Sequence, residues 1–410
     1  MQNVLILMSG SVVSQIIPFI TSPLLGRIYS PELFSVLALF LSTVNILDVF
    51  ATLKYDLAIV VADNEKDAAA TLWLCIIINC LLSLLVLAAT PFVAVLFPRF
   101  VGEQSGWVYL VPLSVLFTSL FTALSYYNLR LDRYKRITQA NIVRSVTAAV
   151  LQVGLGLLGF GAYGLMLGQV TAYLVACILL LYDARRYLPR PSLSLIKAAA
   201  KRHRKFPLFT LPGTLANTLS YNLVTYFLNG FFAPAQLGYY TLVNQVLSTP
   251  LTVISGAVGN VFLKKSADDA SAKSLSVRTF DAITRTLFCL SVPIFAVLFL
   301  FATPILRIFL GEQWAAAGGM VRALIPMFFV RFVVMPVTTS AIVAGRQGAS
   351  MVWQFSLLTA SVLPALIQIF NPLDINRYLT ILSLLLAVSY AAFYLYCRGL
   401  LTKGKKPRAE

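Results

Sequence analysis

The chain has 410 residues, of which 59% are hydrophobic and only 11% are charged. Its apolar runs are far longer than the ~10–14 residues of a buried helix in a water-soluble protein, which indicates an integral membrane protein. The formal net charge of +17 raises the alternative of a nucleic-acid partner, but no module combines basic and aromatic residues. Membrane topology and anionic lipid headgroups account for this charge, and we expect no nucleic-acid binding.

Twelve apolar runs follow one another along the chain, each of the ~20 residues that a membrane-spanning helix needs. They cover residues 3–26, 33–53, 71–97, 107–129, 142–160, 164–182, 207–232, 239–263, 286–303, 320–344, 351–370 and 377–397. The first run lacks the basic segment of a secretory signal, so we interpret it as the first span. Runs such as Leu72–Leu87 do not alternate as barrel strands would. The sequence therefore predicts an all-α membrane protein of about twelve transmembrane helices.

The basic residues lie mostly on one side of these spans. With a cytoplasmic N-terminus, that side receives Lys54, Lys66, Arg346, the basic segments 130–136, 185–205 and 264–285, and the C-terminal tail. The opposite side receives only Arg27, Arg99, Arg307 and Arg377. Because Lys and Arg accumulate in cytoplasmic loops, we expect a multi-pass protein with both termini in the cytoplasm.

The longest polar connection, from Asp183 to Phe206, divides the spans into six and six. An internal repeat supports this division, because Ser30-Pro31 is echoed by Ala233-Pro234, and Gly102-Glu103-Gln104 by Gly311-Glu312-Gln313. Six spans per half give both halves the same orientation, as in a parallel repeat. We expect two six-helix bundles around a central cavity, with these parts: bundle 1–182, basic cytoplasmic linker 183–206, bundle 207–397 and basic cytoplasmic tail 398–410.

Polar side chains spaced three or four residues apart share one helical face of the seventh span: Thr214, Thr218, Asn222, Thr225 and Asn229. The first span has polar residues at matching positions, Ser11, Gln15 and Ser22, and the second span adds Asn45. These faces predict the lining of a polar pathway. The alternative interpretation is that the same residues only join helices through interhelical hydrogen bonds.

Charged residues also lie inside the predicted spans. Arg331 is close to mid-span, where an arginine costs about 2.5–3.5 kcal/mol on insertion scales, so we expect it to face the bundle interior or a wet cavity. Arg144 and Arg322 lie nearer the ends of their spans and can also extend to the interface. Asp48, the clearest acid within a span, either forms an ion pair with a residue such as Arg144 or carries a proton or sodium ion.

The remaining reactive residue types give no site. The five cysteines lie in or at the end of apolar runs and form no CxxC pair, which predicts neither disulfides nor a metal site. The single histidine, His203, lies in the basic linker, where we expect it to be solvated. No phosphate-binding loop of the GxxxxGK type is present. We therefore expect no enzyme activity, no metal and no cofactor beyond a coupling proton or sodium ion.

Motifs in the first quarter of the chain are Pro18, Ser22-Pro23, Arg27-Ile28-Tyr29-Ser30-Pro31, Phe34 and Lys54-Tyr55-Asp56. They resemble those of the bacterial polysaccharide repeat-unit flippases, the Wzx-type branch of the MOP superfamily. Lys54-Tyr55-Asp56 departs from that family's Arg-Tyr-Glu pattern but conserves its charges. The resemblance covers the whole chain through its twelve spans and two halves, and it implies a MATE-like fold.

This resemblance implies a substrate made of an oligosaccharide linked through pyrophosphate to undecaprenol. The substrate would move from the cytoplasmic to the outer leaflet of the bacterial inner membrane by alternating access, for O-antigen or another surface polysaccharide. Implied partners are membrane lipids, a polysaccharide polymerase and chain-length proteins. Because a guanidinium binds phosphate oxygens bidentately, Arg331, supported by Arg144 or Arg322, is predicted to hold the pyrophosphate.

Three alternatives remain open at this stage. A MATE-like cation or drug antiporter shares the twelve-span plan, but it would present acids to its substrate, whereas the spans hold three arginines and one clear acid. A nontransporting scaffold for polysaccharide assembly enzymes would use the basic linker as its docking surface. The third alternative is a flippase for lipid-linked peptidoglycan precursors. Such flippases resemble chains with fourteen spans, whereas this chain has room for twelve.

Overall fold

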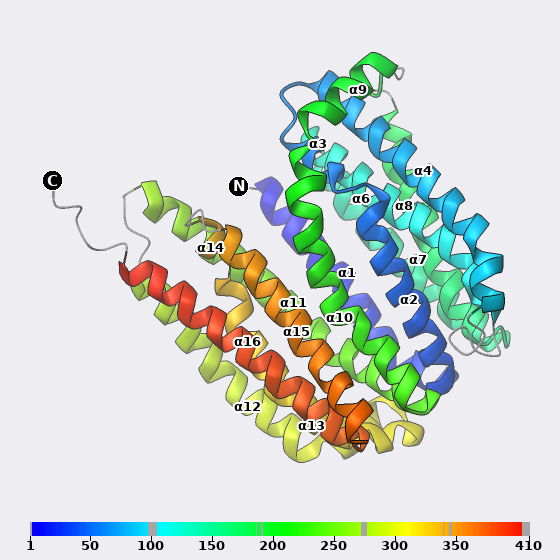
Figure 1. Ribbon diagram of the computed structural model, residues 1–410, viewed down its shortest axis with the longest axis vertical. Coiled ribbons are helices and arrows are strands. Elements are labelled where there is room, and N and C mark those ends of the chain that lie inside the picture. The colour runs from blue at the N-terminus through cyan, green and yellow to red at the C-terminus, as the bar shows by residue number, and fades with distance from the viewer. Residues whose placement is uncertain are drawn as a thin grey trace. The chain divides into compact units, whose positions relative to one another are not determined.

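The computed structural model describes residues 2–96, 105–185, 187–189, 192–271, 277–338, 340–343 and 347–403. Every regular element in these ranges is a helix (Figure 1). The twelve long helices are α1 (Gln2–Ile28), α2 (Pro31–Ala51), α4 (Glu65–Leu96), α6 (Val111–Arg130), α7 (Tyr134–Leu157), α8 (Ala162–Ala184), α10 (Leu211–Phe231), α11 (Pro234–Ser271), α12 (Val277–Leu310), α13 (Gly318–Val334), α15 (Gln347–Phe370) and α16 (Ile375–Lys403). Each coincides with one predicted span, so the all-α membrane class is confirmed.

Shorter helices connect the long ones. They are α3 (Tyr55–Val60), η1 (Ser105–Leu110), α9 (Leu193–Arg202), η2 (Phe206–Thr210), η3 (Glu312–Ala317), η4 (Met335–Val337) and α14 (Ser340–Val343). Of the described helices, nine are long and apolar enough by themselves to cross a membrane. The helix α10 is not one of the nine, because the asparagines and threonines on its polar face lower its hydropathy. The protein is a multi-pass membrane protein.

Internal contacts divide the chain into two compact units, residues 1–238 and 239–410. The first unit includes α10, which packs against α2 and exchanges side-chain hydrogen bonds with it. The sequence predicts the bundle boundary earlier, in the linker 183–206. In the structure, the seventh span packs with the first six spans.

A buried tryptophan precedes the fourth long helix of each half. Trp107 of η1 is 1% exposed and packs edge-on against Phe40 of α2, with ring centroids 6.5 Å apart. Trp314 of η3 is fully buried and packs in the same manner against Tyr239 of α11, at 5.7 Å. Edge-to-face aromatic pairs of this kind add about 0.5–1.5 kcal/mol beyond area burial. The same device in both halves agrees with the internal repeat in the sequence.

In each half, the second long helix begins at a proline. The helix α2 begins at Pro31 after Ser30, and α11 begins at Pro234 after Ala233. Proline suits the first helical position, because its missing N–H would have no intrahelical acceptor there and its φ is already helical. The echo between these two dipeptides therefore marks equivalent helix starts.

The motifs that carry the family resemblance are structural anchors in the first unit. The Tyr29 hydroxyl, on a side chain only 1% exposed, donates to the Gln152 carbonyl at 2.6 Å and so joins the end of α1 to α7. The buried carboxylate of Asp56 accepts from the Thr52 hydroxyl at 3.0 Å. Lys54 adopts a left-handed conformation with φ of 62°, which turns the chain from α2 into α3.

The linker is folded onto the first unit, with α9 lying along α4 (Figure 1). The Trp73 indole donates to the carbonyl of Pro189 at 3.2 Å, and the Tyr55 hydroxyl donates to that of Ala200 at 3.1 Å. These bonds hold the linker at both of its ends. Three of the linker's basic residues, Lys197, Lys201 and Arg202, lie on α9.

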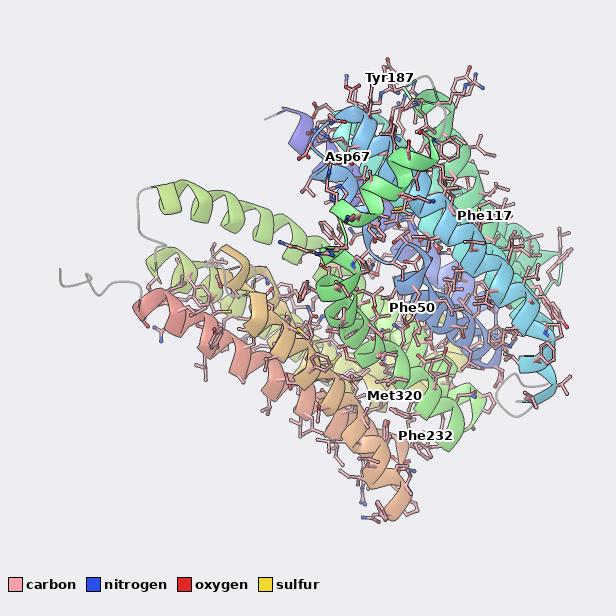
Figure 2. The ribbon with its side chains drawn as sticks, turned by 45° about the horizontal axis from the view of Figure 1, so that its top comes forward. Phe50, Asp67, Phe117, Tyr187, Phe232 and Met320 are labelled. Carbon is pink, nitrogen blue, oxygen red and sulfur yellow. The ribbon has the colours of Figure 1, made fainter. Side chains whose placement is uncertain are left out.

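His203 is buried, so the expectation that it is solvated is wrong. Its side chain is 8% exposed, and Nε2 lies 3.0 Å from a carboxylate oxygen of Asp67 at the start of α4. Arg202 lies 3.3 Å from the same carboxylate and 3.2 Å from that of Asp63. Figure 2 labels Asp67 and Tyr187 at the same end of this unit. The sequence places these groups in separate segments, and only folding brings them together.

In the second unit, a serine of α16 bonds to the backbone of α13 where a proline interrupts the helical hydrogen bonds. Pro326 lacks an N–H and interrupts the helical hydrogen-bond ladder. The hydroxyl of Ser383 from α16 accepts from the Met327 N–H at 2.9 Å and donates to the Leu324 carbonyl at 3.2 Å. Ser383 is fully buried, and α13 and α16 are close neighbours. This bridge fixes the course of α13 just before Arg331.

We expect Ser383→Ala to lower the free energy of unfolding by about 1–2 kcal/mol, because the buried Met327 N–H loses its acceptor. Chemical unfolding in detergent measures this change. Ser389→Ala on the same helix is the matched control, since Ser389 bonds only to the Leu385 carbonyl one turn earlier. Equal losses in the two variants would contradict a bridging role for Ser383.

Candidate functional site

The predicted polar faces of α2 and α10 meet inside the first unit. The Asn45 amide donates to the side-chain oxygen of Asn222 at 3.2 Å. Close by, the hydroxyls of Thr43 and Tyr226 lie 2.8 Å apart. We call the contact formed by these four residues the α2–α10 polar seam. Helical spacing predicts Asn45 and Asn222, whereas Thr43 and Tyr226 are identified only by the tertiary contact.

The other polar residues of the α10 stripe differ in whether they are already hydrogen-bonded or buried. The Thr214 hydroxyl donates to the Thr210 carbonyl at 2.9 Å, and the Asn222 amide also donates to the Thr218 carbonyl at 2.8 Å. Thr225 is buried, whereas the side chains of Thr218 and Asn229 are partly exposed. Thr218 and Asn229 therefore keep the accessible polar atoms that a polar pathway needs.

The α1 candidates do not form an equivalent exposed stripe in the described residues. Ser22 is 1% exposed, and its hydroxyl donates to the Pro18 carbonyl at 2.7 Å. Gln15 is half-buried. The side chain of Ser11 lies outside the described residues. Ser22 therefore satisfies its own helix beside a proline rather than facing a pathway.

Asp48 is held by hydroxyl groups of α6. Its carboxylate accepts from Thr118 at 3.2 Å and from Ser119, which is only 1% exposed. No Lys or Arg of the described segments lies within 4.0 Å of this carboxylate, so the suggested ion pair with Arg144 does not form. A carboxylate surrounded by neutral oxygens has the ligand chemistry that a proton or a hard cation requires.

Arg144 of α7 occupies an aromatic cage formed by two neighbouring helices. Its guanidinium carbon lies 4.9 Å from the ring centroid of Tyr173 and 5.5 Å from that of Phe121. Nη1 donates to the Tyr173 hydroxyl at 3.0 Å, while the buried Nε–H has no hydrogen-bond partner among the described residues. Within the described part of the chain, no carboxylate lies within 4.0 Å of Arg144. Cation–π contact stabilises such a charge by ~0.5–2 kcal/mol and leaves its charge uncompensated.

Sequence reasoning missed the cage residues. Phe121 and Tyr173 lie in α6 and α8, and their rings pack edge to face with centroids 5.5 Å apart. Aromatic residues are frequent in membrane helices, so no spacing rule distinguishes these two from the others. In the sequence, only Arg144 itself indicates this site.

The two arginines of α13 have different environments. Arg322 is exposed, and its Nε donates to the Phe299 carbonyl of α12 at 3.2 Å. This acceptor lies beside the kink at Phe301 in α12, where the backbone is not helical. Arg331 lies in the last turn of α13 and is half-buried. Arg331 is therefore the less exposed of the two arginines of α13.

Comparison with known proteins gives a match over most of the chain. The family model described as "Polysaccharide biosynthesis protein" matches residues 24–318. The succinoglycan biosynthesis transport protein ExoT of Rhizobium meliloti (strain 1021) is 25% identical over 307 residues. That alignment covers 73% of this chain and 60% of ExoT, so the chain spans less than two thirds of this relative.

Two solved structures share the fold at low sequence identity. The lipid II flippase MurJ in an inward closed conformation has a TM-score of 0.72 and 13% identity, covering 98% of this chain and 88% of MurJ. An outward-facing multidrug resistance MATE family transporter of the MOP superfamily has a TM-score of 0.62 and 16% identity, covering 99% of this chain and 96% of the transporter. These matches establish a MATE-like architecture.

Proposed function

The chain belongs to the polysaccharide biosynthesis protein family, and from this premise we propose that it is a flippase for lipid-linked oligosaccharides. The proposed substrate is an oligosaccharide linked through pyrophosphate to a polyprenol such as undecaprenol. It moves by alternating access from the cytoplasmic to the outer leaflet of the bacterial inner membrane, and both chain termini are cytoplasmic. The relative ExoT carries the name of a succinoglycan transport protein, which favours a surface polysaccharide in general over O-antigen in particular.

The observation that carries this proposal is the uncompensated charge of Arg144. Arg144 is half-buried with a buried Nε–H, and a cation in a membrane helix without a nearby carboxylate is costly, so an anionic ligand would offset that cost. The free Nε–H of Arg144 offers a charge-assisted hydrogen bond to a phosphate oxygen. In the second unit, Arg331 supplies a further cation within the membrane. Both Arg144 and Arg331 would repel a cationic substrate.

The polar groups of the first unit supply contacts for the saccharide. The α2–α10 polar seam presents amide and hydroxyl groups, which exchange hydrogen bonds with sugar hydroxyls in place of water. Thr218 and Asn229 extend this polar surface along α10. An inside-negative potential favours outward movement of negative charge by about 2.3 kcal/mol per charge per 100 mV. In the cell, a polymerase and chain-length proteins would use the translocated product.

The decisive experiment reconstitutes the full chain in liposomes. It compares the movement of a defined polyprenyl-pyrophosphate oligosaccharide with the export of a cationic dye. We expect the lipid-linked saccharide to change leaflets and the dye to remain in place. Dye export without saccharide movement would favour the MATE-like antiporter instead. Movement of neither compound by folded protein would favour the assembly scaffold.

Asp48 is the proposed coupling site for a proton or sodium ion. A gradient of about one pH unit is equivalent to ~1.4 kcal/mol, or tenfold in an equilibrium. We therefore expect an imposed gradient of the coupling ion to accelerate wild-type transport, and we expect Asp48→Asn to remove this acceleration. Asparagine keeps an oxygen for the Ser119 hydroxyl but cannot ionise.

The control for this prediction is Asp63→Asn, which neutralises an exposed acid outside the spans. Transport is measured in the same liposomes with and without proton and sodium gradients. An unchanged gradient response in Asp48→Asn would exclude Asp48 as the coupling site.

A further inference from the structure

A groove lies between α12, α13 and α16 of the second unit, three helices that pack side by side (Figure 1). It encloses about 560 Å³. Its apolar wall includes Phe288 of α12, Val333 of α13 and Ala391 of α16. The ring of Phe329 also lines the groove and packs edge-on against that of Phe288, at 5.5 Å between centroids. The largely apolar lining of the groove suits a hydrocarbon chain.

The apolar surface continues past Phe329. A second hollow of about 390 Å³ shares this residue and follows α12 through Val292, Phe295 and Phe299. Successive phenylalanines on α12 therefore line a path that runs along the helix, parallel to the direction of a lipid chain. Exposed side chains such as Phe288, at 50%, keep this path open from outside the unit.

Charge gathers at only one end of the groove. There Arg398 forms two hydrogen bonds with the Asp281 carboxylate, at 2.9 and 3.0 Å, which neutralises that acid. Arg285, one turn after Asp281, is exposed and has no carboxylate within 4.0 Å in the described ranges. The groove mouth therefore carries one net positive charge. The charge bias of the sequence assigns this end of the helices to the cytoplasm.

We infer that this groove binds an anionic phospholipid of the cytoplasmic leaflet, with its phosphate at Arg285 and one acyl chain against Phe288 and Phe329. Basic pockets between membrane helices on the cytoplasmic side are suited to anionic headgroups. A lipid-linked saccharide fits less well, because the hydroxyl of Thr284 at the mouth is already bonded to the Phe280 carbonyl. The residues that line this groove are not among those proposed above to contact the transport substrate.

The test measures lipid binding to the purified full chain by native mass spectrometry. Phosphatidylglycerol is compared with phosphatidylcholine, which has the same chains but no net charge. We expect phosphatidylglycerol to bind more tightly, and Arg285→Ala to weaken its binding about tenfold through loss of a charge-assisted hydrogen bond. Ala391→Trp should block binding while keeping both arginines, because the indole fills the groove. Thermal unfolding confirms that each variant is folded.

Arg307→Ala is the matched control. Arg307 lies at the other end of α12, is exposed, and pairs with Glu312 at 2.9 Å, so its loss removes the same charge outside the groove. Unchanged binding in this control supports the site. Equal binding of the two phospholipids, or equal effects of Arg285→Ala and Arg307→Ala, would overturn it. Displacement of phosphatidylglycerol by a polyprenyl-pyrophosphate saccharide from wild type but not from Arg285→Ala would reassign the groove to the transport substrate.

Discussion

Arg331→Ala is expected to lower the rate of lipid-linked oligosaccharide translocation by about tenfold or more. Hydrogen bonds to charged groups contribute about 1.5–3 kcal/mol, and a bidentate arginine–phosphate pair lies at the strong end. Arg331 lies half-buried in the last turn of α13, after the break at Pro326 that Ser383 stabilises. Removal of a charge from a membrane helix favours insertion, so the variant should reach the membrane in normal amounts.

Two further variants make this expectation specific. Arg331→Lys keeps the charge but loses the planar fork, so it should restore transport only in part. Arg322→Ala removes an arginine from the same helix whose contact is the Phe299 carbonyl, and it should retain most of the transport rate. Rates are measured in reconstituted liposomes and normalised to folded protein. Full transport by Arg331→Ala would exclude a pyrophosphate contact at this residue.

Arg144→Ala is expected to cause a loss of similar size through the first unit. Its guanidinium is held by the rings of Tyr173 and Phe121 and keeps a free Nε–H. A phosphate that approaches this group replaces the missing hydrogen-bond acceptor without breaking an existing ion pair. Alanine removes the Nε–H donor that would bind the phosphate. It also removes the cation–π contacts, which are worth ~0.5–2 kcal/mol.

The Arg144 experiment must separate transport from stability. Arg144→Lys keeps the charge and a cation–π contact but loses the fork, so stability should stay close to wild type while transport falls. Lys135→Ala, near the start of the same helix, is the control for charge removal. Thermal unfolding and transport are measured on the same preparations. Normal transport by Arg144→Lys, together with a stability loss in Arg144→Ala that explains its slower transport, would assign Arg144 a structural role.

Local sequence patterns predict the helices of this protein well. Each apolar run became one long helix, because a bilayer requires every backbone polar group of a span to be satisfied within its own segment. Helical spacing also predicts the polar faces of α2 and α10, which do meet through Asn45 and Asn222. Both predictions depend only on residues within about twenty positions of one another.

Pairing between helices was the part that the sequence left open. Asp48 and Arg144 are opposite charges in two spans of the first unit, yet Asp48 bonds to Ser119 and Arg144 to Tyr173. The sequence predicts that His203 is solvated in the linker, but in the folded chain it is buried against Asp67. A side chain's partner depends on how helices far apart in sequence rotate and approach, and spacing along one helix carries no information about that.

The sequence by itself determined the membrane class, the number and order of the spans, the polar faces and the family resemblance, because hydrophobicity and helical period are local properties. The tertiary structure decided which polar groups are already satisfied and which are available. It bound Arg322 of α13 to a backbone carbonyl of α12 and, among the described residues, left the Nε–H of Arg144 without a partner. That distinction follows from close packing, since a buried donor finds an acceptor only where a neighbouring helix places one.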